Sequence, residues 1–508
     1  MRIAIRTDAS LEIGTGHVMR CLTLADELRE RGASILFICR THAGNLSDLI
    51  ETRGYRVIRL PRSNIASNND ASPHSTHQHW LGTDWQTDAR ETSRALAEES
   101  PWDWLVVDHY ALTNTWETNL RKRAKRIFVI DDLEDRNHDC DLLLDQNLHS
   151  TMEHRYESLV PDSCAQMLGP KFALLRPEFR IAREKFHRVC DKVMRILVFF
   201  GGADPYNYTT LALDALDKAR RPDIHLDVIV GYSNPHIRSL KERITRTENA
   251  EIHVQASNMA QLMAQADLAI GAAGTATWER CCVGLPTIAC AIAENQIQGL
   301  NGAAEQGILC GIVPDDISVT NLSVHIQTLI NNPALRGHLA QRGRETVDGD
   351  GARRVANRIM APIISLRLAT EADSELLYRW RNHPDIRSVS RDSSVIDRGQ
   401  HYSWVQAVIS DPFRCLLIGI SGEQEIGAIR FDISSCEAEI SLYLAPELKG
   451  KGLGHELLSQ GELWLRKQYP EISAITAQVL SDNQASRNLF IDHGYTLNTL
   501  RFNKGLTQ

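Results

Sequence analysis

The stretch that decides the fold is Arg6-Thr7-Asp8-Ala9-Ser10-Leu11-Glu12-Ile13-Gly14-Thr15-Gly16-His17-Val18-Met19-Arg20. It follows a short apolar run at residues 1–5 and leads into an amphipathic segment at 18–31, whose apolar residues recur at helical spacing. This order predicts a strand, a glycine loop and a helix. In an open parallel sheet, such a loop lies at the carboxyl end of its strand, where these folds bind their ligands.

The histidine of this loop is the first candidate catalytic residue. At the start of a helix, the dipole disfavours the imidazolium form of His17, and a neutral imidazole is what a general base requires. The alternative is that Gly14 and Gly16 only form a turn and His17 only caps a helix. The position after the first strand, with Arg20 one turn further on, favours a functional role. A dinucleotide site is excluded because Met19 stands where the third glycine of G-x-G-x-x-G belongs.

Length and composition set limits on the class of protein. The chain has 508 residues, which is too long for one core and suits about three domains. A net charge of -8 argues against general binding to nucleic acid or to an anionic membrane surface. From the sequence we expect neither a signal peptide nor an apolar run long enough to span a bilayer. The 11 cysteines form no C-x-x-C pair, so we expect reduced thiols and a cytoplasmic protein.

The pattern of apolar runs predicts an α/β protein of three domains. Strands that alternate with helices imply parallel sheets, and two such blocks suggest two Rossmann-like lobes at residues 1–190 and 191–362. After Pro362 the pattern changes to that of an α+β domain at 365–508. The polar stretch 63–79 is expected to be a surface loop and a possible lid. The expected strands are 1–5, 34–39, 56–60, 105–108, 127–130, 142–144, 195–200, 226–230, 251–254, 268–270, 287–291, 415–420, 425–432, 438–444 and 475–480.

Two glycine loops of the second lobe are typical of phosphate-binding sites. The first contains Gly201, Gly202 and Asp204, and the second runs over 271–279. Bare backbone near glycine lets amides approach an anion, and the start of a helix adds favourable charge. Thr275 and Glu279 are four residues apart and share a helix face, where a carboxylate can accept both hydroxyls of a ribose.

The order of motifs in this lobe resembles the nucleotide site of GT-B enzymes that use UDP-sugars. The motifs are Gly271-Ala272-Ala273-Gly274-Thr275-Ala276-Thr277-Trp278-Glu279, then Gly284-Leu285-Pro286, then Glu294-Asn295-Gln296. The resemblance implies a two-lobed GT-B fold and a UDP-linked substrate. It also implies that no metal is needed, because amides and a helix dipole take the charge of the departing diphosphate. A short D-x-D motif, Asp139-Cys140-Asp141, is common by chance and is not expected to bind a metal.

The first 360 or so residues resemble the UDP-2,4-diacetamido-2,4,6-trideoxy-β-L-altropyranose hydrolases of pseudaminic acid synthesis. The resemblance rests on the opening stretch, on Val107-Asp108-His109-Tyr110, Ile130-Asp131-Asp132, Leu144-Asp145-Gln146-Asn147 and the loops of the second lobe. It implies that His17 activates water for attack at the sugar C1 and that UDP leaves with inversion. The motif Asp131-Asp132 remains open between such a role and helix N-capping, and Asp108-His109-Tyr110 remains open between such a role and a turn at the end of a strand. The implied substrate-binding residues are Arg6, Asp8, Gly14, Gly16, Arg20, Tyr110, Gly201, Gly202, Asp204, Gly274, Thr275, Glu279, Glu294, Asn295 and Gln296.

The last domain resembles the GNAT acetyltransferases. An alternating strand at 437–444 runs into Lys449-Gly450-Lys451-Gly452-Leu453-Gly454, whose amides and lysines can hold a pyrophosphate at the start of a helix. Asn483 and the segment 490–495 complete the pattern. The resemblance implies acetyl-CoA as co-substrate. The implied cofactor-binding residues are Leu444, Lys449, Gly450, Lys451, Gly452, Leu453, Gly454 and Asn483.

The acid–base groups of this domain are the next candidates. Many GNAT enzymes carry a tyrosine as general acid where this chain has Phe490, which leaves Tyr495, Tyr443, water or unassisted departure of the thiolate as alternatives. Glu439 is the candidate base for the amine, and the alternative is a solvated strand carboxylate. The segment 378–384 resembles the GNAT enzyme that acetylates the 4-amino group of a UDP-linked amino sugar, although a helix that ends before Pro384 explains it as well.

Together these patterns predict a bifunctional enzyme that acetylates a UDP-4-amino sugar and then hydrolyses the diacetamido product. Two other classes of function stay open from the sequence. One is a GT-B glycosyltransferase with a sugar, lipid or protein acceptor, joined to a CoA-binding domain. The other is a sensor of nucleotide sugars without catalysis. The sequence fixes neither the configuration of the sugar nor the oligomeric state.

Overall fold

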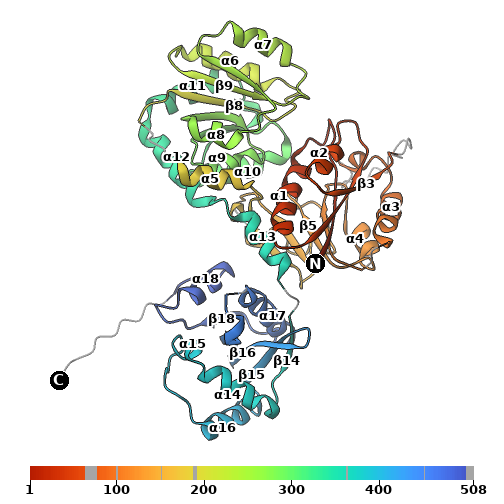
Figure 1. The fold of residues 1–508 in the computed structure, drawn as a ribbon. Coiled ribbons are helices and arrows are strands. Elements are labelled where there is room, and N and C mark those ends of the chain that lie inside the picture. Colours follow the sequence, from red (N-terminus) through yellow and green to blue (C-terminus); the bar gives the residue numbers. More distant parts are fainter. Residues whose placement is uncertain are drawn as a thin grey trace, which may run out of the picture. The chain divides into compact units, whose positions relative to one another are not determined.

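The computed structural model describes residues 1–62, 77–98, 101–149, 152–186, 191–361, 364–450 and 452–498. Residues 63–76, which are most of the expected surface loop 63–79, therefore lie outside the described residues. The predicted cofactor residue Lys451 also lies outside them. The chain forms two compact units, Met1–Ile359 and Met360–Gln508 (Figure 1). The first unit contains both predicted Rossmann-like lobes.

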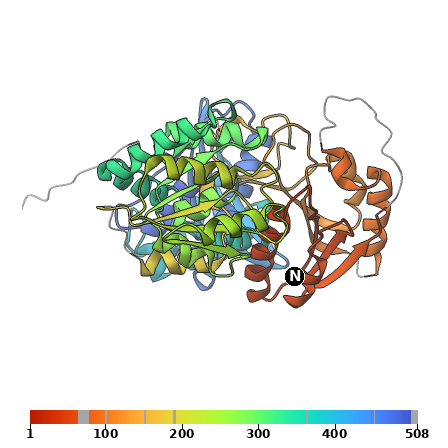
Figure 2. The same ribbon diagram turned by 90° about the horizontal axis from the view of Figure 1, so that it is seen from above.

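The first lobe is built on a seven-stranded parallel sheet with the order β3-β2-β1-β4-β5-β6-β7. In the view from above, its red and orange strands run side by side, with helices of the same colours around them (Figure 2). All six predicted strands are present, and a seventh, β7, was not predicted. The strands are β1 Arg2–Thr7, β2 Ser34–Arg40, β3 Arg56–Leu60, β4 Trp102–Asp108, β5 Ala124–Ile130, β6 Leu142–Asp145 and β7 Ala165–Leu168. The helices are α1 Gly16–Glu30, α2 Ser47–Thr52, α3 Trp85–Ala97 and α4 Asn114–Leu120.

The order of strands places two loops at the centre of this sheet. Strand β1 pairs with β2 on one side and with β4 on the other, so the strand order reverses at β1. In open α/β sheets, the crevice for a ligand forms at such a reversal. Because Thr7 pairs with Asp108, the last residues of β1 and β4 lie next to each other. The loop that carries His17 therefore starts beside the end of β4.

A network of buried charges ties β1 and β2 to α3. Arg6 pairs with Asp8 at 2.6 Å and with Asp88 at 2.7 Å, and Arg40 pairs with Asp88 at 2.6 Å. All four side chains are completely buried. Burial alone would raise the pKa of Asp88, but Arg6 and Arg40 outweigh burial and hold this pKa below its usual value. Buried ions need such pairing, since an uncompensated charge in a protein interior costs several kcal/mol.

The second lobe has a six-stranded parallel sheet with the order β10-β9-β8-β11-β12-β13. Helices α6, α7 and α11 cover one face, and α8 and α9 lie on the other (Figure 1). Successive strand residues serve these two faces in turn: Val198 packs toward α6 and Leu197 toward α8. The strands are β8 Arg195–Phe199, β9 His225–Val230, β10 Ala250–Val254, β11 Leu268–Ala272, β12 Thr287–Cys290 and β13 Cys310–Ile312. The helices are α5 Pro177–Lys185, α6 Tyr208–Ala219, α7 Ile237–Thr245, α8 Met259–Gln265, α9 Ala276–Cys282, α10 Ile297–Glu305, α11 Val319–Asn331, α12 Pro333–Thr346 and α13 Gly351–Met360.

The packing of two helices differs from the expected lobe boundaries. Helix α5 precedes residue 190, yet its buried face, including Phe179, belongs to the core of the second lobe. Helix α13 follows the second lobe and contacts the first, where the indole of Trp104 donates a hydrogen bond to the carbonyl oxygen of Ile359 at 3.0 Å. Each lobe therefore packs against one helix from the other lobe's stretch of sequence. The apolar face of each helix determines which lobe it packs on, rather than its place in the chain.

The unit Met360–Gln508 is built on a five-stranded sheet with the order β14-β15-β16-β17-β18. Its pairs are antiparallel except for the parallel pair of β17 with β18, which extends only from Glu437 to Ile440 on β17. The strands are β14 Ser365–Leu368, β15 Arg414–Ser421, β16 Gln424–Ser434, β17 Glu437–Leu444 and β18 Ala474–Ala477. The helices are α14 Ser374–Asn382, α15 Pro384–Arg387, α16 Arg398–Ile409, α17 Leu453–Gln468 and α18 Gln484–Asp492. Across the described residues, no helix combines the length and apolar character needed to cross a membrane.

Candidate functional site

The imidazole of His17 is held by a buried carboxylate. His17 lies in the first turn of α1, and its Nδ1 is 2.6 Å from Oδ1 of Asp108 at the end of β4. Burial opposes ionisation of Asp108, but the charges of Arg20 and His17 outweigh burial and hold the pKa of Asp108 far below its usual value. Because a carboxylate only accepts hydrogen bonds, we assign the proton to Nδ1 of His17. Nε2 is then the nitrogen that can accept a proton.

Arg20 connects this pair to a second carboxylate. Its Nε and Nη2 donate to the two oxygens of Asp108, each at 2.7 Å, and its Nη1 donates to Oδ2 of Asp132 at 2.6 Å. The hydroxyl of Tyr110 donates to the same oxygen of Asp132 at 2.6 Å. The structure thus places Asp108 and Asp132 in the network around His17. Asp131, by contrast, accepts hydrogen bonds from backbone N–H groups further along its own turn.

His17, Arg20, Tyr110 and Asp132 line a pocket of about 200 Å³ that includes residues of both lobes. Trp80 is stacked with Tyr110, with ring centroids 5.8 Å apart, and Tyr110 meets the ring of His17 edge-on at 4.6 Å. Trp80 and His149 could not be predicted from the sequence, because neither lies in a motif. The lining residues that the sequence predicted are Gly16, His17, Arg20, Tyr110, Gly274, Thr275, Asn295 and Gln296. Those it did not assign include Trp80, Asp132, Asn147, His149, Thr277, Trp278 and Gly299.

Three of the predicted substrate residues in the first lobe do not line this pocket. Arg6 and Asp8 are completely buried and pair with each other, so they support the site from behind. His109 is buried beside this pair and does not line the pocket either; its Nε2 lies 3.3 Å from Oδ2 of Asp8. Gly14 has a φ of +80°, and its N–H donates to the carbonyl oxygen of Ser10, so its place in the motif is explained by the turn.

Five of the predicted residues in the second lobe also lie away from the pocket lining: Gly201, Gly202, Asp204, Glu279 and Glu294. Asp204 accepts hydrogen bonds from the backbone N–H groups of Tyr208 and Thr209, both at 2.9 Å, so its carboxylate stabilises the start of α6. Glu279 lies 3.6 Å from Arg176, and burial raises the pKa of Glu279 above its usual value. Direct contact of these residues with a ligand remains a prediction.

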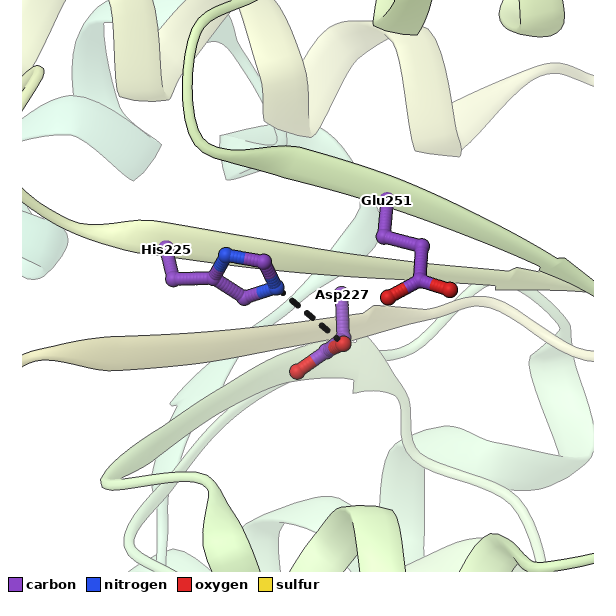
Figure 3. Close-up of side chains that lie close together, drawn as sticks. All are labelled: His225, Asp227 and Glu251. Atoms are coloured by element: carbon purple, nitrogen blue, oxygen red, sulfur yellow. Dashed lines mark ion pairs between the residues drawn. The ribbon is translucent and has the colours of Figure 1, made fainter.

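One cluster in the described part of the chain has the spacing of metal ligands: His225, Asp227 and Glu251 on strands β9 and β10 (Figure 3). Asp227 is already engaged, because Arg195 donates to both of its oxygens and His253 lies 2.9 Å from one of them. A cation would have to displace the guanidinium, so the cluster is better explained as an ion-pair network. That the enzyme needs no metal stays a prediction.

The D-x-D motif is likewise occupied by an arginine. Arg121 donates to Asp139 from Nε at 3.1 Å and from Nη2 at 2.7 Å, and its Nη1 donates to Asp141 at 2.5 Å. Asp141 also accepts from the backbone N–H of Ile127. The motif therefore fixes the turn before β6.

The second unit contains a cavity of about 820 Å³ where β17 and β18 separate. Gly450 and Gly452 have φ values of +79° and +76°, which glycine adopts without strain. Asn483 lines the cavity while its side chain caps α18. Leu453 is buried in the core and does not line the cavity. The predicted residues that do line it are Glu439, Leu444, Lys449, Gly450, Gly452, Gly454 and Asn483.

The side chains considered for acid–base chemistry occupy different places. Glu439 lines the cavity and accepts a hydrogen bond from Arg391 at 2.5 Å. Phe490 and Tyr443 line it too. Tyr495 does not, because its hydroxyl donates to Glu462 at 2.9 Å. Of the two tyrosines, only Tyr443 is thus placed to meet a ligand in this cavity.

Three arginines, Arg381, Arg391 and Arg430, line the same cavity. Nη1 of Arg381 and Nε of Arg430 are buried and have no hydrogen-bond partner among the residues that the structure describes. A buried donor without a partner costs about 1–3 kcal/mol. These side chains are therefore suited to an anionic ligand in addition to the loop at Lys449.

The fold and the sites define the class of protein: a GT-B unit followed by a GNAT acetyltransferase domain. Residues 195–357 match the glycosyltransferase family 28 C-terminal domain, and residues 364–496 match the GNAT acetyltransferase domain. The structure of MurG from Acinetobacter baumannii aligns over 70% of this chain and 99% of its own, with a TM-score of 0.50 and 15% identity. That likeness shows the fold alone.

Two curated relatives each match one part of the chain, and a third matches nearly all of it. The UDP-2,4-diacetamido-2,4,6-trideoxy-beta-L-altropyranose hydrolase of Campylobacter jejuni is 26% identical over 52% of this chain and 81% of its own. Acetyltransferase PseH of Campylobacter jejuni is 29% identical over 27% of this chain and 86% of its own. The uncharacterized protein MJ1062 of Methanocaldococcus jannaschii is 24% identical over 97% of this chain and 96% of its own. The chain is therefore a fusion of a hydrolase-like GT-B unit with a GNAT domain.

Proposed function

We propose that the GT-B unit hydrolyses UDP-2,4-diacetamido-2,4,6-trideoxy-β-L-altropyranose to the free sugar and UDP. The observation that carries this proposal is His17, held by the buried Asp108, in a pocket that the glycine loop at Gly274 and Thr275 also lines. A base and an anion-binding loop in one small pocket suit displacement of a nucleotide by water. The name of the Campylobacter jejuni relative supports the choice of sugar.

In the proposed reaction, Nε2 of His17 accepts a proton from water as the water oxygen bonds to C1 of the sugar. The bond from C1 to the β-phosphate oxygen breaks, and its electron pair leaves with UDP. Asp108 stabilises the imidazolium that forms, as an orienting carboxylate does in other His–Asp pairs. The amides near Gly274 take up charge on the diphosphate. The stacked rings of Trp80 and Tyr110 offer an apolar wall for the deoxy sugar.

We propose that the GNAT domain transfers the acetyl group of acetyl-CoA to the 4-amino group of the UDP-linked precursor. The loop at Lys449 and Gly450 holds the pyrophosphate of CoA. Glu439 removes a proton from the amine, whose nitrogen attacks the thioester carbonyl, and the CoA thiolate leaves. Tyr443 is the candidate proton donor to that thiolate because it lines the cavity. The arginines of the cavity bind the diphosphate of the acceptor.

The two proposed reactions are consecutive, since acetylation gives the diacetamido sugar that hydrolysis consumes. The proposal implies two substrates, a UDP-linked amino sugar and acetyl-CoA. The two matched domains support a nucleotide-sugar substrate and acetyl-CoA as classes of substrate. The cytoplasmic location expected from the cysteine pattern stays a prediction.

The test is to incubate the full chain with the UDP-diacetamido sugar and no acceptor. We expect release of UDP and free sugar, and mass spectrometry of the UDP-4-amino sugar with acetyl-CoA should show addition of one acetyl group. If UDP appears only after an acceptor is added, the GT-B unit is a glycosyltransferase. If the protein binds the UDP-sugar but never turns it over, the sensor interpretation holds instead.

A further inference from the structure

A second histidine of the pocket has no role in the reaction described above. His149 lies four residues after Asp145, which ends β6. Its side chain is 8% exposed and lines the pocket together with His17 and Thr275. Its Nε2 is buried and has no hydrogen-bond partner in the described ranges of the chain. Such a group in the wall of a ligand pocket indicates that the ligand completes its bonding.

The carboxyl group behind His149 is fixed from several sides. Oδ2 of Asp145 lies 3.7 Å from Nε2 of His149 and accepts a hydrogen bond from Nε of Arg155 at 2.7 Å. Oδ1 of Asp145 accepts from the backbone N–H of Asn147 at 2.9 Å. Asp108 and His17 lie 2.6 Å apart, whereas Asp145 is too far from His149 for a hydrogen bond, so Asp145 leaves Nε2 of His149 available to a ligand.

The second lobe closes on His149 through a glycine. A Cβ atom on Gly302 of α10 would lie 2.9 Å from the carbonyl oxygen of Leu148 and 3.4 Å from Cα of His149. Only a residue without a side chain lets α10 approach this segment so closely. His149 is therefore held where both lobes contribute to the pocket.

We propose that His149 binds the β-phosphate of the UDP-sugar and of the departing UDP by donating a hydrogen bond from its ring. This inference rests on the proposed function. The pocket measures about 200 Å³, and the base His17 must reach the sugar C1 within it. The phosphate bonded to C1 is the β-phosphate, so it is the part of the nucleotide that a second group in the same small pocket meets.

The protonation state of His149 allows its ring to donate a hydrogen bond to the phosphate. Burial, together with Asp132, raises the pKa of Asp145 to about 7, and burial lowers the pKa of His149 to about 4. Near neutral pH the ring of His149 is therefore neutral and carries one N–H. With that proton on Nε2, the nitrogen that has no partner among the described residues is the one that donates to the phosphate. His149 keeps its proton throughout: the proton of water goes to His17, and the electron pair of the broken bond stays on UDP.

The experiment compares the affinities of the full chain for UDP and for UMP, which lacks the β-phosphate. We expect His149→Ala to lose roughly tenfold to hundredfold in affinity for UDP while its affinity for UMP stays within about twofold. His149→Gln, which keeps a donor of similar reach, should recover most of the loss. His154→Ala is the matched control, because the side chain of His154 is 74% exposed and pairs with Glu157.

Equal losses for UDP and UMP in His149→Ala, or no loss for either, would overturn the inference. A wild-type protein that binds UDP with the expected dependence on His149 but releases none from the UDP-sugar overturns only the proposed hydrolysis. A wild-type protein without measurable affinity for UDP overturns both.

Discussion

Replacement of Asp108 by asparagine tests whether the buried carboxylate drives the proposed hydrolysis through His17. Oδ1 of Asp108 lies 2.6 Å from Nδ1 of His17, so the carboxylate charge stabilises the imidazolium that forms when the ring takes a proton. Two unit charges about 4 Å apart interact by roughly 4 kcal/mol at an effective dielectric constant of about 20. Since about 1.4 kcal/mol corresponds to a factor of ten, we expect Asp108→Asn to lower the rate of UDP release by about a thousandfold.

The folded state should survive this change. Arg20 keeps its hydrogen bond to Asp132 at 2.6 Å, so the guanidinium is not left without a counter-charge, and we expect a cost of about 1–3 kcal/mol in the free energy of unfolding. The assay is UDP release at saturating UDP-sugar, with UDP affinity measured on the same preparation. Because Asp108 acts through His17, the double variant with His17→Ala should be no slower than His17→Ala alone. A loss below tenfold in a folded Asp108→Asn protein, or a further loss in the double variant, would refute the reasoning.

Four other outcomes follow from the geometry. Gly302→Ala should slow UDP release and destabilise the protein by about 1–3 kcal/mol, because its Cβ would meet a backbone oxygen at 2.9 Å. Gly337→Ala is the control, because open space surrounds Gly337, and it should not slow the reaction. Thermal unfolding and the UDP assay compare the two variants. Glu439→Gln should lower acetyl transfer roughly 10- to 100-fold, most at low pH where the amine is protonated, and a wild-type pH profile would point to another base. Gly452→Ala should weaken acetyl-CoA binding about tenfold in a direct titration, since φ is +76° there. The pKa of His149 is about 4 in the folded protein, so the unfolded chain takes up a proton first as the pH falls below about 6.5, and this favours unfolding. Between pH 7 and pH 5, the melting temperature of the wild type should therefore drop roughly 2–4 °C more than that of His149→Asn.

The sequence predicted most of the sheet strands because buried strands are dense in branched apolar residues. It missed β7, β13 and β14, which stand at the edges of their sheets. Edge strands of three or four residues carry too few apolar positions to show a period. The two exchanged helices, α5 and α13, could not be assigned either, since an apolar helix face does not reveal which lobe it covers.

For the site, local motifs were informative and long-range contacts were not. His17 follows from its loop, but its partner Asp108 is 91 residues away and becomes its neighbour only because β1 pairs with β4. Trp80 and His149 meet the pocket through packing that no motif encodes. Asp204 shows the opposite case: a carboxylate near two glycines predicts a phosphate site, and in the structure both of its oxygens accept hydrogen bonds at the start of α6, so its contact with a ligand stays a prediction.

The buried charges that join β1, β2 and α3 constrain how this sequence can change over generations. Loss of Arg6, Asp88 or Arg40 alone strands an opposite charge in the interior and costs about 3–5 kcal/mol, a large fraction of the stability of a typical domain. A single substitution at any of these positions is therefore removed by selection long before a compensating one arises. Descendants of this chain should inherit the set intact or exchange it together for apolar side chains, so these positions should covary across three separate segments of the gene.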